Sequence, residues 1–167
     1  MKKYNVLVID DERIIRDGIS KSIDWEALNL NLQGSCEDAF DALDIFNNNP
    51  PDIAIVDIRM PGMSGLELIE TVRKEGIPIQ FIILSGYGEF ELAQKAISFG
   101  VRQYLLKPIN PEKLKQSLMD ISKELATHSD TSKWTLHRSL KQTLSGIDKN
   151  SDTLKKYLFT EEDLFWV

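Results

Sequence analysis

A run of four apolar residues closed by an acid constrains the fold of this chain more than any other feature. The run from Ile53 to Val56 is too short for a buried helix, and Asp57 follows it, with the turn signal Pro61-Gly62 shortly after. An uninterrupted apolar run of this length is typical of a strand that is buried on both faces. Such a strand favours a parallel sheet covered by helices on each side.

Similar strands and helices alternate along most of the chain. Apolar residues at helical spacing separate the strands and predict five helices, of which two carry clear start signals: Ser64 with Glu67 forms a capping box, and Asn110 precedes Pro111. Right-handed crossovers then predict an α/β fold, a doubly wound five-stranded parallel sheet. The other four strands are expected at Tyr4–Ile9, Leu32–Cys36, Ile79–Leu84 and Val101–Leu106.

Chain length and a change in the residue pattern divide the chain into two parts. With 167 residues it can hold one ordinary domain and an appendage. We expect the domain at 1–125. The region 126–167 opens with a polar stretch, 127–133, and then shows two short amphipathic patterns. It is therefore predicted to be a helical linker, or the start of a connector to an output domain.

Composition excludes several classes of protein. The net charge of −6 argues against a primary nucleic-acid surface, which normally carries a basic patch. No apolar run approaches the roughly 20 residues that a membrane span needs, and no signal-peptide core follows Met1. The lone Cys36 excludes an intramolecular disulfide. Together these observations predict a cytoplasmic protein without a membrane partner.

Polar side chains gather where the predicted strands end. Asp10 and Asp11 follow the first strand, Asp57 the third, Ser85 the fourth and Lys107 the fifth. The carboxyl ends of parallel strands share one edge of a sheet, which is where ligands bind in this class of fold. Converging carboxylates repel one another unless a cation joins them. A hard divalent cation such as Mg²⁺, with oxygen ligands and open positions for a phosphate oxygen, suits this edge.

This set of groups favours phosphoryl transfer onto a carboxylate oxygen. Such a reaction depends largely on positioning and charge neutralisation. Asp57 is the candidate nucleophile because it ends the central strand, while Ser85 offers a hydroxyl donor and Lys107 a mobile positive charge. In isolation each residue has an ordinary interpretation, such as a helix cap, a turn cap or a solvated charge. Their conjunction at ordered strand ends favours the functional one.

Four segments together resemble the receiver domain of two-component response regulators over about residues 1–125. The resemblance implies a flavodoxin-like strand order 2-1-3-4-5, the order of the chemotaxis receiver. The Ser85–Gly100 region further resembles receivers of regulators with an AraC-type DNA-binding domain. No second pair of basic helices follows in these residues, so DNA binding is expected through an output domain outside them. The four segments are Asp10-Asp11, Val56–Gly65, Leu84–Tyr87 and Tyr104–Pro108.

The resemblance also implies residue roles and partners. Asp57 accepts a phosphoryl group from a sensor histidine kinase, and Lys107, before a cis bond to Pro108, binds the phosphate. Ser85 and Tyr104 form the switch pair, which alters the surface of the fourth helix, fifth strand and last helix. Homodimerisation on phosphorylation is a further hypothesis. The implied Mg²⁺ ligands are Asp11, Asp57 and the backbone carbonyl of Arg59, with Asp10 acting through water.

Two alternatives come from other functional classes. An aspartate-nucleophile phosphohydrolase of the haloacid dehalogenase kind has its Asp-x-Asp after the first strand, whereas here Arg59 stands two residues after Asp57, and Asp57 follows the third strand. We therefore expect a regulatory domain that is not an enzyme beyond assisting its own phosphorylation and slow dephosphorylation. The other alternative is a phosphorylation-independent interaction module. It would be signalled by loss of an acid, the hydroxyl or the lysine, and none is lost.

Overall fold

The computed structural model describes residues 2–86, 90–101 and 103–127, in which five strands alternate with five helices. Their order along the chain is the one that the apolar pattern predicts. The elements are β1 Tyr4–Ile9, α1 Arg13–Ser22, β2 Leu30–Cys36, α2 Ala39–Asn48, β3 Ile53–Asp57, α3 Gly65–Lys74, β4 Gln80–Ser85, α4 Phe90–Ser98, β5 Gln103–Leu106 and α5 Pro111–Thr127.

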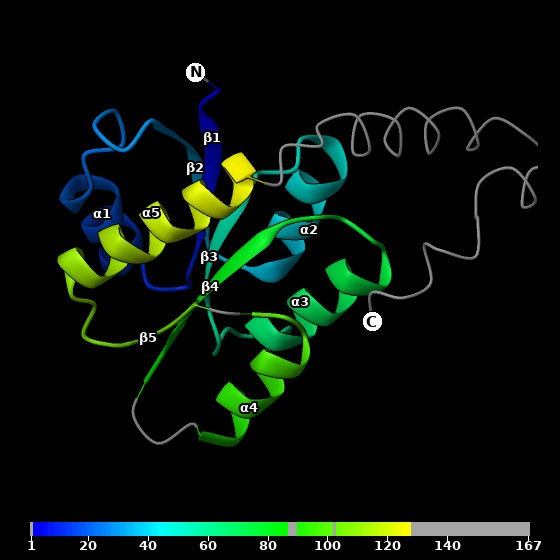
Figure 1. The fold of residues 1–167 in the computed structure, drawn as a ribbon. Coiled ribbons are helices and arrows are strands. Elements are labelled where there is room, and N and C mark those ends of the chain that lie inside the picture. The colour runs from blue at the N-terminus through cyan, green and yellow to red at the C-terminus, as the bar shows by residue number, and fades with distance from the viewer. Residues whose placement is uncertain (1, 87–89, 102, 128–167) are drawn as a thin grey trace, which may run out of the picture. The chain divides into compact units, whose positions relative to one another are not determined.

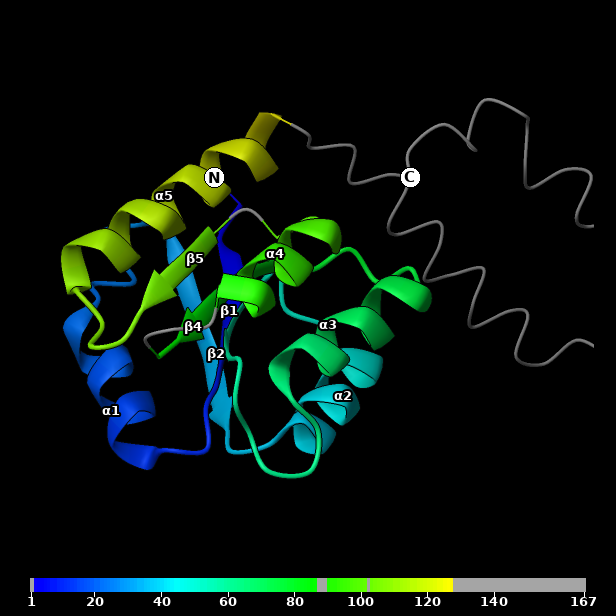
Figure 2. The same cartoon turned by 90° about the horizontal axis from the view of Figure 1, so that it is seen from below.

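The strands form one parallel sheet between two helical layers. Its order is β2-β1-β3-β4-β5, which confirms the doubly wound, flavodoxin-like prediction. In Figures 1 and 2, α1 and α5 cover one face of the sheet, while α2, α3 and α4 cover the other. The central strand β3 is buried along its whole length, as its apolar run predicts. Asp57 is therefore carried by the most enclosed strand of the sheet.

Apolar contacts between the sheet and its helices make up the core. On the α1 and α5 side, the even-numbered side chains of β4, Ile82 and Leu84, pack with Ile19 of α1 and Leu118 of α5. The stripe at Leu114, Leu118 and Ile121 is thus the buried face of α5. Burial of such side chains contributes about 1.5–3 kcal/mol each. This packing holds the strand ends in place at the edge where the polar residues gather.

Local capping chemistry sets the start of two helices. Ser64 Oγ accepts a hydrogen bond from the Glu67 N–H, and the Glu67 carboxylate accepts one from the Ser64 N–H, so the predicted capping box is present. Asn110 Oδ1 accepts hydrogen bonds from the N–H groups of Glu112 and Lys113 at the start of α5. Each cap satisfies backbone donors that the first turn leaves unpaired.

Element bounds differ from the predicted ones at three strands. β2 begins at Leu30, two residues early and directly after a left-handed turn at Asn29 (φ 55°). The register of β1 with β2 also shifts between Val6 and Leu7, opposite Gly34. β4 is displaced by one residue to end at Ser85, and β5 is described from Gln103. Pairing with the neighbouring strand decides where these strands end. The hydrophobic pattern of one segment carries no information about that pairing.

The predicted C-terminal extension lies outside the described residues, with the exception of the end of α5. That helix continues to Thr127, so the boundary expected after 125 falls within its last turn. The short amphipathic patterns beyond 133, and Tyr87, also lie outside the described residues. Among the helices that the structure describes, none combines the length and the apolar character of a bilayer span.

Candidate functional site

Three aspartates converge at the carboxyl ends of two adjacent strands. Asp57 is the last residue of β3, and Asp10 and Asp11 directly follow β1, which pairs with β3. One carboxylate oxygen from each aspartate lies within 4.8 Å of the others. Asp10 and Asp57 are buried, whereas Asp11 is exposed. The sheet topology therefore brings together acids that are 46 residues apart in the chain, as predicted from the strand ends.

Lys107 reaches into this acidic cluster from the end of β5. Its Nζ lies 3.0 Å from Asp10 Oδ2 and 3.0 Å from Asp57 Oδ2, and 3.4 Å from a Glu12 carboxylate oxygen. The Lys107–Pro108 peptide bond is cis, and the Lys107 N–H donates to the Ser85 carbonyl at 2.7 Å. One ammonium group thus touches acids from both strands.

Burial and charge act in opposite directions on these groups. Burial raises the pKa of Asp10, and the nearby Lys107 ammonium offsets part of that rise. Burial also lowers the pKa of Lys107, but its close contacts and charge interactions with Asp10 and Asp57 outweigh this and raise the pKa above the ordinary value. Lys107 is therefore fully protonated at neutral pH. A single positive charge still faces three aspartates, so the cluster is left electronegative.

The cluster fits a hard divalent cation. It offers three carboxylate groups whose oxygens are close enough to share one ion, and oxygen is the donor type that Mg²⁺ prefers. Asp10 Oδ2 is buried and accepts no hydrogen bond of good geometry from the described residues, although the Lys107 ammonium lies beside it. A second cation would stabilise this buried oxygen by pairing with its charge.

The loop between β3 and α3 holds Asp57 in a fixed orientation. The Arg59 N–H donates to Asp57 Oδ1 at 3.2 Å, so the Arg59 backbone lies beside the carboxylate, while its side chain is exposed. The Gly65 N–H donates to the Ile58 carbonyl at 3.0 Å. A Cβ atom at Gly65 would overlap the Asp57 carbonyl oxygen, so α3 can approach the strand end this closely because residue 65 is glycine.

Ser85 and Tyr104 lie on the same face of the sheet. Ser85 is opposite Leu106 in the β4–β5 register, and Tyr104 is opposite Ile83, which makes Ser85 and Tyr104 diagonal neighbours. Ser85 is fully buried and its Oγ donates to the Gly86 carbonyl at 3.0 Å, while Tyr104 is half-buried. The two residues are therefore neighbours across β4 and β5, and their role as a switch pair stays a prediction.

Sequence reasoning missed three residues that support the site. Arg16 of α1 hydrogen-bonds to the backbone of Asp10 and Asp11, Glu12 contacts Lys107, and Gly65 permits the close approach of α3. Arg16 is one of several charged residues on α1, so its residue type alone could not indicate its target. The position of Gly65 directly after a helix cap was the available signal for a close contact.

Comparison with known proteins gives close relatives. The chain is 44% identical over 134 residues to YesN of Bacillus subtilis, which is named an uncharacterized transcriptional regulatory protein. The aligned region covers 80% of this chain but 36% of YesN. It is 35% identical to the transcriptional regulatory protein HptR of Staphylococcus aureus over 66% of this chain and 43% of HptR. The chain thus spans less than half the length of these curated relatives.

Solved structures and a family model agree with the fold. The REC domain of AraT from Geobacillus stearothermophilus is 37% identical, with a TM-score of 0.71 over 76% of this chain and 98% of that one. A two component transcriptional regulator AraC from Clostridium phytofermentans is 31% identical, with a TM-score of 0.69 over 77% and 99%. The model of the response regulator receiver domain matches residues 6–119. The cluster at the strand ends thus lies in a domain of known type, and the chain belongs to the response regulator receiver family.

Proposed function

We propose that this chain is the phosphoacceptor domain of a two-component response regulator. A sensor histidine kinase donates the phosphoryl group, and Asp57 accepts it. The observation that carries this proposal is the position of the Asp57 carboxylate. It lies at the end of the central strand, within one acidic cluster and 3.0 Å from the ammonium group of Lys107. Receiver domains as a family take phosphoryl groups from such kinases.

The residues around Asp57 suit this transfer. One Asp57 carboxylate oxygen bonds to phosphorus while the phosphorus–nitrogen bond of the donor phosphohistidine breaks, and the electron pair returns to the imidazole nitrogen. Lys107 is protonated and its Nζ lies 3.0 Å from Asp57 Oδ2, beside the transferred oxygens, and the Arg59 N–H orients the carboxylate. The domain is thereby a regulatory acceptor and not an enzyme acting on a separate substrate.

Asp11, Asp57 and the backbone carbonyl of Arg59 would hold Mg²⁺, with Asp10 contributing through water. The ion would neutralise charge on the transferring phosphoryl oxygens. The cluster's three carboxylate groups and the buried Asp10 oxygen support this assignment. Lys107 pairs with both Asp10 and Asp57, so the ammonium group beside the acceptor is available to the phosphoryl group.

The switch acts through Ser85 and Tyr104. In the structure Ser85 donates to its neighbouring carbonyl, and a phosphoryl group on Asp57 would offer a more strongly charged acceptor. Movement of Ser85 toward that acceptor leaves space into which the adjacent Tyr104 turns, and this favours an active arrangement already present as a minor population.

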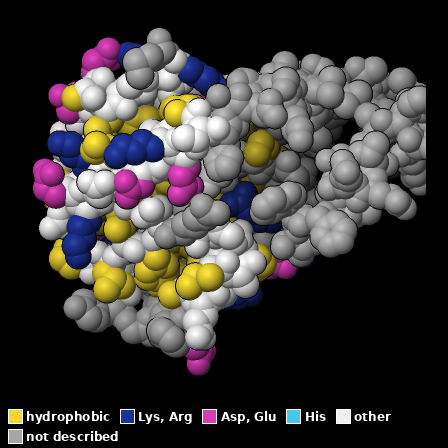
Figure 3. Space-filling model, viewed as in Figure 1, with side chains coloured by type: hydrophobic (Ala, Val, Ile, Leu, Met, Phe, Trp, Pro, Cys, Tyr) yellow, Lys and Arg dark blue, Asp and Glu magenta, His cyan; other side chains and the backbone are white. Residues whose placement is uncertain are grey.

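The output surface is formed by α4, β5 and α5. Figure 3 shows apolar side chains on the face that carries α4 and β5. Ile97 of α4 is 70% exposed, and Leu106 of β5 is 48% exposed. We expect phosphorylation to promote homodimerisation through this surface in the cytoplasm. Control of transcription would follow through an AraC-type DNA-binding region outside these residues. The longer relative YesN is named a transcriptional regulatory protein, and the similar Clostridium structure is named a transcriptional regulator AraC.

Intact mass after incubation with Mg²⁺ and acetyl phosphate tests the phosphoacceptor assignment. Wild-type protein should gain one phosphoryl group that hydroxylamine removes, and Asp57→Asn should gain none. Size-exclusion chromatography of the same samples reports dimerisation, and Ser85→Ala should weaken phosphorylation-driven association. Wild-type protein that stays unmodified with both acetyl phosphate and a phosphorylated histidine kinase would instead indicate a phosphorylation-independent interaction module.

A further inference from the structure

We infer that Arg16 is a positioning residue for the metal site: it holds the backbone of Asp10 and Asp11 so that their carboxylates face the divalent cation. The inference rests on the proposed function, because it concerns the same Mg²⁺ site. It assigns a role to an arginine of α1 that lies outside the acidic cluster and contacts the ligand residues through their main chain.

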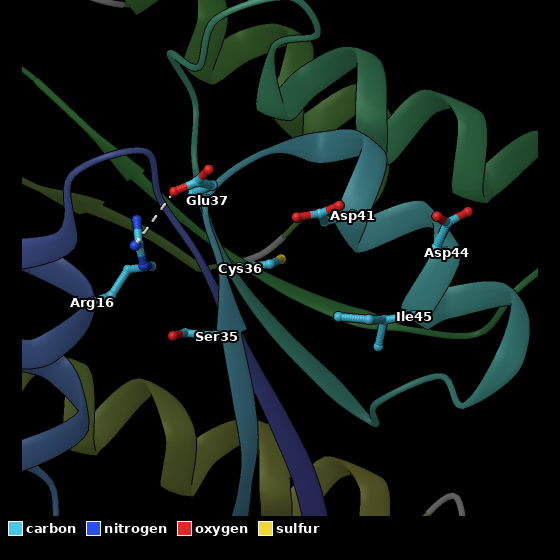
Figure 4. Close-up of a pocket in the computed structure, with 7 residues that line it drawn as sticks. All are labelled: Arg16, Ser35, Cys36, Glu37, Asp41, Asp44 and Ile45. Carbon is cyan, nitrogen blue, oxygen red and sulfur yellow. Dashed lines mark ion pairs between the residues drawn. The ribbon is translucent and has the colours of Figure 1, made fainter.

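The contacts of Arg16 are made with two consecutive carbonyl groups. Its Nη1 donates to the Asp10 carbonyl at 2.6 Å and to the Asp11 carbonyl at 3.2 Å. Its Nη2 lies 3.9 Å from a carboxylate oxygen of Glu37, and the Arg16 side chain is 13% exposed. Figure 4 shows Arg16 reaching from α1 toward Glu37, which follows β2. The guanidinium therefore bridges α1, the β1–α1 loop and the end of β2.

These bonds determine which groups of the loop face the cation. Both carbonyls are engaged by Arg16, so neither is free to turn toward the cluster. Asp10 is held further by its N–H, which donates to the Cys36 carbonyl at 3.3 Å, and by its Oδ1, which accepts from the Glu12 N–H at 2.9 Å. Asp11 is exposed and is not held by burial as Asp10 is, so the hydrogen bond from Arg16 restrains its backbone more than that of Asp10. A loop fixed in its bound conformation loses less entropy when the ion binds.

The pair with Glu37 contributes little to this restraint. Glu37 is 70% exposed and the separation is 3.9 Å, which is typical of a surface ion pair of small net effect. The two carbonyl hydrogen bonds come from one planar, charged group with fixed donor directions. Lysine would keep the charge at this position but could not reproduce the two bonds and the contact to Glu37 with the same geometry.

The sign of the effect on Mg²⁺ affinity separates positioning from simple charge. Arg16 is a positive charge near a cation site, so removing it should strengthen Mg²⁺ binding if charge alone mattered. If Arg16 positions the ligand residues, removing it should weaken binding. Loss of a group that supports metal ligands typically weakens affinity by about 10–100-fold.

The experiment is an NMR titration of the full 167-residue chain with Mg²⁺ alone, following the backbone amides of Asp11 and Asp57. We expect Arg16→Gln to raise the Mg²⁺ dissociation constant about tenfold, Arg16→Lys to give an intermediate value, and Glu37→Gln to change it less than twofold. Arg13→Gln is the matched control, since Arg13 is on the same helix, 85% exposed and paired with Asp17. It should leave the affinity unchanged or slightly higher.

Folding and the proposed function are checked in the same series. Thermal unfolding without Mg²⁺ identifies the variants that fold, and Arg16→Lys carries the test if Arg16→Gln does not. Affinity in a folded Arg16 variant equal to or above that of wild type would overturn the inference while leaving the proposed function intact. Absence of a saturable shift in wild-type protein would overturn the metal assignment itself, and the role of Arg16 with it.

Discussion

The two helices that follow β3 and β4 are anchored to the sheet very differently. α3 buries five residues and starts with a complete capping box, and Gly65 brings it against the end of β3. Among the described side chains of α4, Ala96 is the one buried residue, and Ile97 is 70% exposed. The proposed acceptor Asp57 leads into the firmly held helix, whereas the proposed switch residue Ser85 leads toward the loosely held one.

We propose that this difference separates a fixed part of the domain from a part that responds to phosphorylation. Elements with few buried contacts open at lower free energy than elements packed in the core. Phosphoryl transfer needs a carboxylate held in one geometry, and a signal needs a surface that can shift. α4 is tied at its C-terminal end by Arg73, whose Nε donates to the Phe99 carbonyl at 3.0 Å.

Isoleucine truncations on the two helices should give the largest contrast. Ile69 of α3 is fully buried, so Ile69→Ala should lower the free energy of unfolding by about 3–4 kcal/mol through lost burial and a cavity. Ile97→Ala on α4 should change it by less than about 0.5 kcal/mol because the side chain is solvated. Urea unfolding of both variants measures the difference, and equal losses would show that α4 is packed as firmly as α3.

Adding a methyl group at Gly65 should be the next largest effect. Gly65→Ala should destabilise by about 2–3 kcal/mol because the new Cβ overlaps the Asp57 carbonyl oxygen and displaces α3 or the strand end. Phosphorylation of Asp57 should slow as well, which intact mass can follow. Gly18→Ala is the control, since nothing lies within 4 Å and it should stabilise α1 by about 0.5–1 kcal/mol.

Removing the tie between α3 and α4 should loosen α4 selectively. Arg73 also donates to the Ile79 carbonyl at 2.9 Å, and its guanidinium lies 5.2 Å from the centre of the Phe81 ring. Arg73→Met leaves both carbonyls without this donor and should lower stability by about 2 kcal/mol.

Amide hydrogen exchange should accelerate more in α4 than in α2 when Arg73 is replaced. Lys74→Met is the matched control, because Lys74 is exposed and pairs with Glu70 on the same helix, and it should have an effect below about 0.5 kcal/mol. Uniform acceleration of exchange across all helices in Arg73→Met would contradict a specific tie to α4.

Loss of the α3 cap should have a smaller effect. Ser64→Ala removes the side chain that accepts from the Glu67 N–H and should lower the free energy of unfolding by about 1 kcal/mol. Urea midpoints measure the loss. An unchanged midpoint would mean that tertiary packing alone holds the start of α3, which would sharpen the contrast with α4 still further.

The charge of Glu67 should give the smallest effect, with a defined pH dependence. Hydrogen bonds from Ser64 lower the pKa of Glu67 below its ordinary value of 4.5. A lowered pKa in the folded state means that the carboxylate stabilises the fold above pH 4.5 and that this contribution fades as the pH falls through the lowered pKa. The stability difference between wild type and Glu67→Gln should therefore be full at pH 7 and shrink in acid. A difference that is independent of pH would contradict a charged cap.

Prediction from sequence succeeded where the signal is local. The apolar run before Asp57, the capping box at Ser64 and the cap at Asn110 each depend on neighbours within a few residues, and all of them are present in the structure. Strand ends at Leu30 and Ser85 were displaced by one or two residues because pairing with another strand decides them. The contacts of Arg16 and Arg73 had no local signal at all.

The sequence by itself determined the alternation of five strands with five helices and the set of polar residues at the strand ends. Periodicity and turn chemistry are properties of adjacent residues, so they can be read without coordinates. The tertiary structure alone decided that Lys107 lies 3.0 Å from both Asp10 and Asp57, that Arg16 holds the carbonyls beside them, and that α4 is less buried than α3. These are distances between groups far apart in the chain, and only the packing of the complete sheet and its helices sets them.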